Sequence, residues 1–213
     1  MLGEQTSEPE VSRIYVYVDG ESHFLRSEAA WRTLHGPEAS LAQLKHCGAD
    51  DPEMLLVDER AKVFWSRTLS PGFHRAYYFT SASVDKPKRY EIDVSLRNFN
   101  LEPHVLEERS QLANRRRDIR DSAGLIEKPK GVDIELVVRM MEDAERLEVC
   151  HLYTSDIDFL PVIRAVRAKG KLVYVFGFDG GIASESPFRT QCDGFTDLTD
   201  MLRTKFVPTG PAA

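Results

Sequence analysis

Short runs of apolar and β-branched residues alternate along this chain with segments of helical periodicity, and this alternation leaves few folds open to it. Five runs are typical of strands, and they cover residues 14–18, 75–80, 102–108, 148–154 and 171–178. Strands that are separated by helices predict a parallel sheet built from β–α–β units. We therefore expect an α/β domain with a mostly parallel sheet.

Helices are expected between these strands. One apolar stripe at helical spacing lies within residues 131–146 and consists of Ile134, Val137, Met141 and Ala144. A second stripe follows Asp158 and consists of Val162, Ile163, Ala165 and Val166. Further helices are expected at about residues 24–46, 53–69, 88–99 and 187–192.

The chain of 213 residues is long enough for one large domain or two small ones. We expect a single domain over residues 13–206, with a surface insertion at about 36–70 and disordered ends at 1–12 and 207–213. No run of about 18 apolar residues occurs, so no membrane span is expected. The acidic, polar start does not fit a secretory signal. Three distant cysteines argue against a disulfide framework or a zinc cluster, and indicate a reducing, cytoplasmic setting.

Acidic residues follow two of the expected strands. Asp19 ends the first strand, and Asp156 and Asp158 follow the fourth. Sites in open parallel sheets form at the carboxyl ends of strands, so these three carboxylates converge if the two strands are neighbours. A fourth acid, Asp133, starts the helix before the fourth strand. Helix capping accounts for Asp158, and the helix dipole accounts for an acid at Asp133, but neither explains Asp156.

Clustered carboxylates without Cys or His are the ligand set of hard cations such as Mg²⁺ and Mn²⁺. Such ions activate water and stabilise the in-line displacement of a phosphoryl group. Residues 109–130 carry seven basic side chains against three acidic ones, a local charge of +4 in a chain whose net charge is −6. This segment is either a solvated face or a contact for a phosphate backbone. Together these features favour phosphodiester chemistry.

Four segments resemble, in order, those of the NYN family, the PIN-like domains found in LabA-like proteins. They are VDGES, KGVDIELVVRMMEDA, YTSDIDFLPVIRAVRAKGKLVYVFGF and QCDGFTDL, and the resemblance covers about residues 14–202. It implies a PIN-like, doubly wound (Rossmann-like) sheet with helices on both faces. It also implies an Mg²⁺- or Mn²⁺-dependent ribonuclease that acts on RNA. The acids that match are Asp19, Asp133, Asp156 and Asp158, with Asp193 as an additional candidate metal ligand.

The expected substrate contacts come from two serines and four basic residues, namely Ser22, Ser155, Lys130, Arg115, Arg116 and Arg117. The two serines depart from the family motif, because Ser22 stands where Asn is usual and Ser155 where Gly is usual. The Ser22 hydroxyl can still bond a phosphate or a metal-bound water, but it reaches less far than an amide.

Two alternatives to a ribonuclease remain open. A nucleic-acid-binding or regulatory module would keep the acidic site without useful turnover. A HAD-type phosphatase would explain Asp19 and Gly20 after a strand, but its mechanism needs a second Asp two residues after the first, where this chain has Glu21. A homodimer also stays open. The large aromatic residues are expected in the core rather than at a base-stacking surface, and they are Trp31, Trp65, Tyr77, Tyr78 and Phe79.

Overall fold

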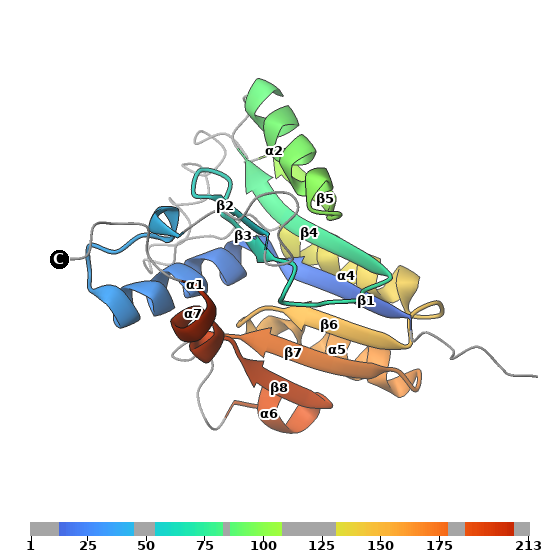
Figure 1. The fold of residues 1–213 in the computed structure, drawn as a ribbon. Helices are drawn as coiled ribbons and strands as arrows, with labels where there is room; N and C mark the ends of the chain where they lie inside the picture. Colours follow the sequence, from blue (N-terminus) through green and yellow to red (C-terminus); the bar gives the residue numbers. More distant parts are fainter. Residues whose placement is uncertain (1–12, 45–53, 83–85, 108–130, 179–185, 207–213) are drawn as a thin grey trace, which may run out of the picture.

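The computed structural model describes residues 13–44, 54–82, 86–107, 131–178 and 186–206 (Figure 1). Its main sheet contains β1 (Ile14–Asp19), β4 (Arg75–Ala82), β5 (Glu102–Glu107), β6 (Val149–Tyr153), β7 (Leu172–Gly177) and β8 (Gly194–Asp197). The strand order is β5-β4-β1-β6-β7-β8, and every neighbouring pair is parallel. All six carboxyl ends therefore lie at one edge, toward the left in Figure 1.

The five strands expected from the sequence are all present, and the first and fourth of them are direct neighbours. Val18 near the end of β1 pairs with Tyr153 at the end of β6. On its other side, β1 pairs with β4, where Asp19 lies opposite Phe79. The parallel α/β fold is confirmed, and so is the adjacency on which the convergence of acids depends.

Helices cover both faces of the sheet. They are α1 (Gly20–His35), α2 (Lys86–Asn98), α4 (Val132–Asp143), α5 (Leu160–Ala168), α6 (Phe188–Gln191) and α7 (Thr199–Lys205), with 3₁₀ turns η1 (Leu41–Gln43) and η2 (Ile157–Phe159). Residues of α1, α2 and α7 share one apolar core with one face of the sheet, and residues of α4, α5 and α6 share a second core with the other face. The aromatic residues expected in the core are all buried, and they are Trp31, Trp65, Tyr77, Tyr78 and Phe79.

The prediction of a helix at about residues 53–69 is wrong. This stretch forms an antiparallel hairpin of β2 (Leu55–Asp58) and β3 (Val63–Ser66). Its strands are rich in β-branched and aromatic residues, which pack well on a pleated surface. Lys62 closes the turn in the left-handed region, with φ of 54°.

The segment 36–70 was expected to be a surface insertion, but several of its described residues are buried in the core. Leu55, Phe64 and Trp65 of the hairpin are buried, as are Leu41 and Leu69 outside its strands. All five belong to the core that contains α1. The ends at 1–12 and 207–213, which were expected to be disordered, lie outside the described residues.

Helix α4 buries a different stripe from the one expected. Ile134 is 63% exposed and Met141 is 37% exposed, although Ala144 is buried. The buried face instead carries Val132, Leu136, Met140 and Ala144. Apolar residues lie on both sides of this helix, so helical spacing alone could not identify the inner side.

The bounds of α1 and two elements near the C-terminal end of the described chain also differ from expectation. Helix α1 starts directly at Gly20 and ends at His35, where Gly36 has φ of 103° and stops the helix. Strand β8 and helix α7 were not expected, because GFTD is short and carries little apolar signal.

Within the part of the chain that the structure describes, no helix is both long and apolar enough to cross a membrane.

Candidate functional site

Asp19 occupies the end of β1 and is held there by two neighbours. Its side chain is almost fully buried, and Oδ1 accepts a hydrogen bond of 3.3 Å from the Ser22 backbone N–H, which caps α1. Oδ2 accepts a 2.8 Å bond from the Thr154 hydroxyl. Gly20 permits this sharp entry into α1, because a Cβ there would lie 2.3 Å from the Tyr78 ring. The carboxylate is therefore placed in advance of any ligand.

Thr154 joins the end of β6 to the end of β1. Besides donating to Asp19, its Oγ1 accepts a 3.1 Å bond from the Asp156 backbone N–H. A second link runs from the Ser155 backbone N–H to the Ser22 hydroxyl at 3.3 Å. The two serines that depart from the family motif thus contact each other, and Ser22 bonds the protein backbone at this edge.

The roles expected for Asp156 and Asp158 in capping are reversed. Asp156 is the N-cap of η2, and its Oδ1 accepts a 3.0 Å bond from the Asp158 backbone N–H. Asp158 lies exposed in the first turn of η2. The reason is the 3₁₀ turn, which starts the helical segment upstream of α5. Asp156 therefore has a structural role in addition to any role in binding.

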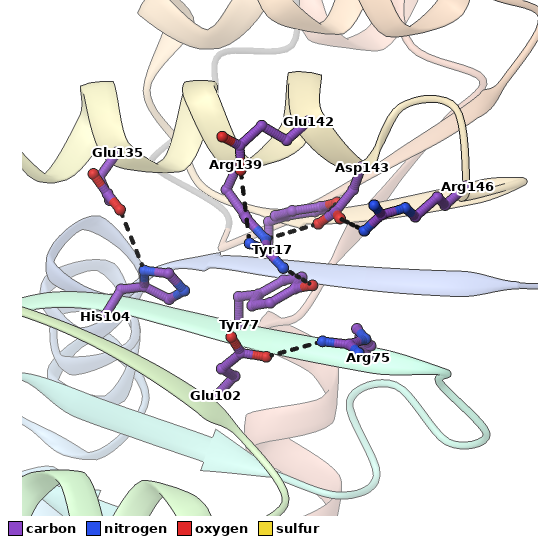
Figure 2. Close-up of polar contacts among 10 residues, drawn as sticks. All are labelled: Tyr17, Arg75, Tyr77, Glu102, His104, Glu135, Arg139, Glu142, Asp143 and Arg146. Carbon is purple, nitrogen blue, oxygen red and sulfur yellow. Dashed lines mark hydrogen bonds and ion pairs between the residues drawn. The ribbon is translucent and has the colours of Figure 1, made fainter.

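Asp133 lies in the first turn of α4, half-buried, at the same edge of the sheet. The start of α4 is located by the neighbouring Glu135, whose carboxylate lies 3.5 Å from Nδ1 of His104 (Figure 2). His104 belongs to β5 and pairs in register with Phe79, which is opposite Asp19. Asp19, Asp156 and Asp158 thus follow β1 and β6, and Asp133 begins α4; that the four share one metal site stays a prediction.

A buried polar network fixes α4 on the sheet (Figure 2). The Asp143 carboxylate accepts bonds from the Tyr17 hydroxyl at 3.1 Å and from Nε of Arg139 at 2.9 Å. The same arginine donates to the Tyr77 hydroxyl at 2.7 Å and lies over its ring. Burial is the main cause that raises the pKa of Tyr17 above its ordinary value, with smaller contributions from Cys150 and then Asp143, so its hydroxyl stays protonated. This network sets the position of the helix that carries Asp133.

Asp193 is not brought to this edge. It precedes β8 and so lies at the amino edge of the sheet, where Arg167 donates bonds of 2.9 and 3.0 Å to it. It also accepts a 2.7 Å bond from the Val173 backbone N–H. The structure gives Asp193 a contact that holds β7, β8 and α5 together, which corrects its assignment as a metal ligand.

The segment QCDGFTDL also contains a second acid, which was not predicted as a site residue. Asp197 ends β8 at the carboxyl edge, and its side chain accepts a 2.9 Å bond from the Thr199 backbone N–H. Its position follows only from the existence of β8, whose short sequence carries no clear strand signal. The expected phosphate contacts lie outside the described residues; they are Arg115, Arg116, Arg117 and Lys130.

The donor chemistry of this edge fits a hard cation. Mg²⁺ is commonly held by one or two carboxylates, with waters and substrate phosphates completing its shell. Asp19 and Asp156, linked through Thr154, supply such carboxylates, and Ser22 adds a hydroxyl. Among the described residues, no three His, Cys, Asp or Glu side chains form a group that could hold a metal ion. The oxygen donors at this edge therefore suit a hard cation in their chemistry, but the described side chains do not form a complete coordination shell.

His23, directly after Ser22 in α1, is buried between aromatic rings. Its ring centroid lies 5.4–5.5 Å from those of Phe64, Tyr153 and Phe178, and its Nε2 has no hydrogen-bond partner in the described parts of the chain. Burial lowers the pKa of His23 to about 3. The imidazole is therefore neutral in the folded protein across the physiological range.

This burial predicts a loss of stability in acid. Because the folded pKa lies below the unfolded value of about 6.5, the contribution of His23 is complete above that pH and is lost as the pH falls toward 3. Each pH unit in this window should cost about 1.4 kcal/mol. The change His23→Phe should flatten the pH dependence of the unfolding free energy, measured by urea titration between these limits. An unchanged slope would contradict the assignment.

Comparisons with known proteins agree with this architecture. A search of curated protein sequences returned no match. Among solved structures, a protein of unknown function from Vibrio parahaemolyticus RIMD 2210633 is similar, with a TM-score of 0.54 and 15% identity. That match covers 90% of this chain and 96% of the other chain, and at such low identity it concerns the fold alone.

The family comparison is more informative. The model of the NYN domain matches residues 13–199, which is most of the chain. The matched range contains β1, α4 and β6, and with them all four acids at the carboxyl edge. The chain belongs to the NYN domain family, a family of nuclease-like domains.

Proposed function

We propose that this protein is a metal-dependent endoribonuclease that hydrolyses RNA phosphodiester bonds at the carboxyl edge of β1 and β6. The observation that carries the proposal is the buried carboxylate of Asp19, which Thr154 connects to the loop that bears Asp156. This carboxylate, held by hydrogen bonds from Ser22 and Thr154, presents oxygen donors of the kind that a hard cation prefers. Membership of the NYN family supports nucleic acid as the substrate.

In this proposal Asp19 and Asp156 hold the cation, and Asp133 and Asp158 lie at the same edge to bind metal-bound waters. Mg²⁺ or Mn²⁺, when bound, supplies an activated water and neutralises charge on the phosphate. The protein contributes placement, because the Thr154 and Ser22 bonds fix the Asp19 carboxylate and the Asp158 backbone N–H bonds the Asp156 carboxylate. Fixed groups need no reorganisation during the reaction.

A binding module without turnover is the second candidate, and one observation favours it. Both principal acids already serve the backbone, since Asp19 caps α1 and Asp156 caps η2. These caps would keep both residues useful even if catalysis had been lost. The Ser22 hydroxyl, which accepts a bond from Ser155, is also engaged in the fold. Only a measurement of turnover separates the two candidates.

The substitution Asp156→Asn offers a clean test. Asn is as good an N-cap as Asp, so η2 should stay formed while the negative charge is lost. Cleavage of labelled single-stranded RNA in Mn²⁺ should fall by about 10²-fold, because a cation contributes several kcal/mol to the transition state and each 1.36 kcal/mol is tenfold. A variant that folds normally and cleaves at the wild-type rate would remove Asp156 from the mechanism.

A further inference from the structure

Three basic side chains from separate parts of the sequence come together beside the acidic edge. Arg60 lies in the turn of the β2–β3 hairpin, and Lys86 and Lys88 lie in the first turn of α2. Arg60 and Lys86 are exposed and Lys88 is half-buried. We refer to these three residues as the basic ledge. The two elements are joined at this point, because Nζ of Lys88 donates a 3.3 Å bond to the Arg60 backbone carbonyl.

The hairpin turn is anchored at the carboxyl end of β4. The Thr80 hydroxyl donates a 2.7 Å bond to the Ala61 carbonyl, and the Tyr78 hydroxyl donates a 3.1 Å bond to the Lys62 carbonyl. Tyr78 pairs with Val18 in β1, one residue before Asp19. The turn that carries Arg60 is therefore held at the level of the candidate active site.

A salt bridge ties the same turn to the helix that Asp19 caps. Nζ of Lys62 lies 2.5 Å from the carboxylate of Glu21, which is in the first turn of α1. Glu21 is two residues beyond Asp19 in the sequence. The basic ledge thus lies on the β4 side of Asp19, whereas Asp156 lies on the β6 side.

The three side chains of the ledge differ in their ion pairing from the cations beside them. Its neighbours Lys62 and Arg89 form ion pairs with Glu21 and Glu107, respectively. By contrast, no member of the ledge forms an ion pair with another residue that the structure describes. The two acids of the hairpin turn bond neutral groups and not a ledge side chain, since Asp58 accepts bonds from the backbone of its own turn and Glu59 accepts one from the Ser40 hydroxyl.

Three cations that form no ion pair with a described residue, at one edge of the sheet, offer a contact for an anionic ligand. A polymer of phosphates fits best, because the cations are spread over two elements and the N-terminus of α2 adds a favourable dipole. An RNA strand that crosses the ends of β6, β1 and β4 would meet Asp156, Asp19 and then the ledge.

We propose that the basic ledge binds the phosphate backbone of the RNA whose scissile bond lies at Asp19 and Asp156. This inference rests on the proposed function and extends it with a defined substrate contact. Phosphate contacts position a strand without reading its sequence, so the ledge should act on all RNA sequences alike. The β2–β3 hairpin, which is part of the segment 36–70, thereby has a proposed role in substrate binding.

The test measures the binding of a labelled, mixed-sequence, single-stranded RNA oligonucleotide in EDTA over a series of salt concentrations. The triple variant Arg60→Gln/Lys86→Gln/Lys88→Gln should bind more weakly than the wild type. Its slope of log affinity against log salt should be shallower by about 2, because each phosphate contact to a single strand contributes about 0.7.

A matched control removes the same three charges at the opposite edge of the sheet. Arg146, Lys169 and Lys171 lie where α4 and α5 end and where β7 begins, so they share the amino edge. The variant Arg146→Gln/Lys169→Gln/Lys171→Gln should keep the wild-type salt slope. Equal slopes for all three proteins would overturn the proposal and leave the ledge as a solvated face or a contact for an acidic protein.

Binding in EDTA separates this inference from the proposed function. A protein whose RNA affinity depends on the ledge but which cleaves nothing in Mn²⁺ would retain the contact and lose the nuclease assignment. If the wild-type protein cleaves RNA in Mn²⁺ but the ledge variant has an unaltered salt slope, the nuclease assignment stands and the ledge contact is rejected. Absence of RNA binding by the wild-type protein would overturn the ledge as well.

Discussion

Replacing Asp19 with Asn should lower the rate of RNA cleavage by about 10³-fold, the largest effect on activity expected of any single substitution here. Asn keeps the shape of the side chain and can still accept the Ser22 backbone N–H, so the start of α1 should be preserved. The negative charge is lost at a buried position, where water cannot replace it as a ligand. The measurement is the initial rate of cleavage of labelled RNA in saturating Mn²⁺.

Asp193→Asn is the matched control for this experiment. Asp193 is also an acid of the sheet, but it lies at the amino edge and bonds Arg167. Its replacement should leave the cleavage rate within a few-fold of the wild type. If Asp19→Asn and Asp193→Asn had the same activity, the active site would not be at the ends of β1 and β6.

The largest effect on stability is expected for Asp143→Ala. The Asp143 side chain is only 2% exposed and bonds both Tyr17 and Arg139 (Figure 2). Its removal leaves the Arg139 guanidinium without its closest acidic partner and the Tyr17 hydroxyl without this acceptor. Loss of one partner from a buried ion pair typically costs about 3–5 kcal/mol. Urea unfolding should show a loss of this size.

Glu142→Ala is the comparison that isolates burial. Glu142 also lies close to Arg139, at 3.7 Å, but its side chain is 61% exposed. Exposed ion pairs contribute about 0–1 kcal/mol, so this variant should unfold almost like the wild type. Similar losses for both variants would show that the buried network does not hold α4 in place.

Much of this fold could be predicted from the sequence, because its strongest signals are local. The strands β1, β6 and β7 are dense in β-branched and aromatic residues, and each is followed by a turn or a helix start. The adjacency of β1 and β6 was the assumption from which the shared acidic edge followed, and the structure confirms it.

The remainder depended on information that the sequence pattern does not carry. Leu55 to Ser66 has apolar residues that suit a helix or a hairpin, and packing against α1 decides between them. Asp156 became a cap because a 3₁₀ turn precedes α5, a choice made by local geometry. Asp193 and Asp197 are four residues apart, and only the direction of β8 shows which of them reaches the carboxyl edge.

The basic ledge shows the same limitation. Arg60 lies far from Lys86 and Lys88 in sequence, and no pattern in the sequence indicates that the two stretches lie close together. Their proximity depends on the hairpin, which helical spacing did not predict. The conspicuous basic segment at residues 109–130 lies outside the described residues, so its expected contact with RNA stays a prediction.

The central claim is that the wild-type protein hydrolyses RNA with a divalent cation. The most direct test incubates the purified protein with labelled single-stranded RNA in Mn²⁺, in Mg²⁺ and in EDTA, and resolves the products by size. The account predicts internal cleavage with either metal and intact RNA in EDTA. RNA that stays intact under all three conditions, with a folded protein that still binds it, would contradict the account and favour the binding module.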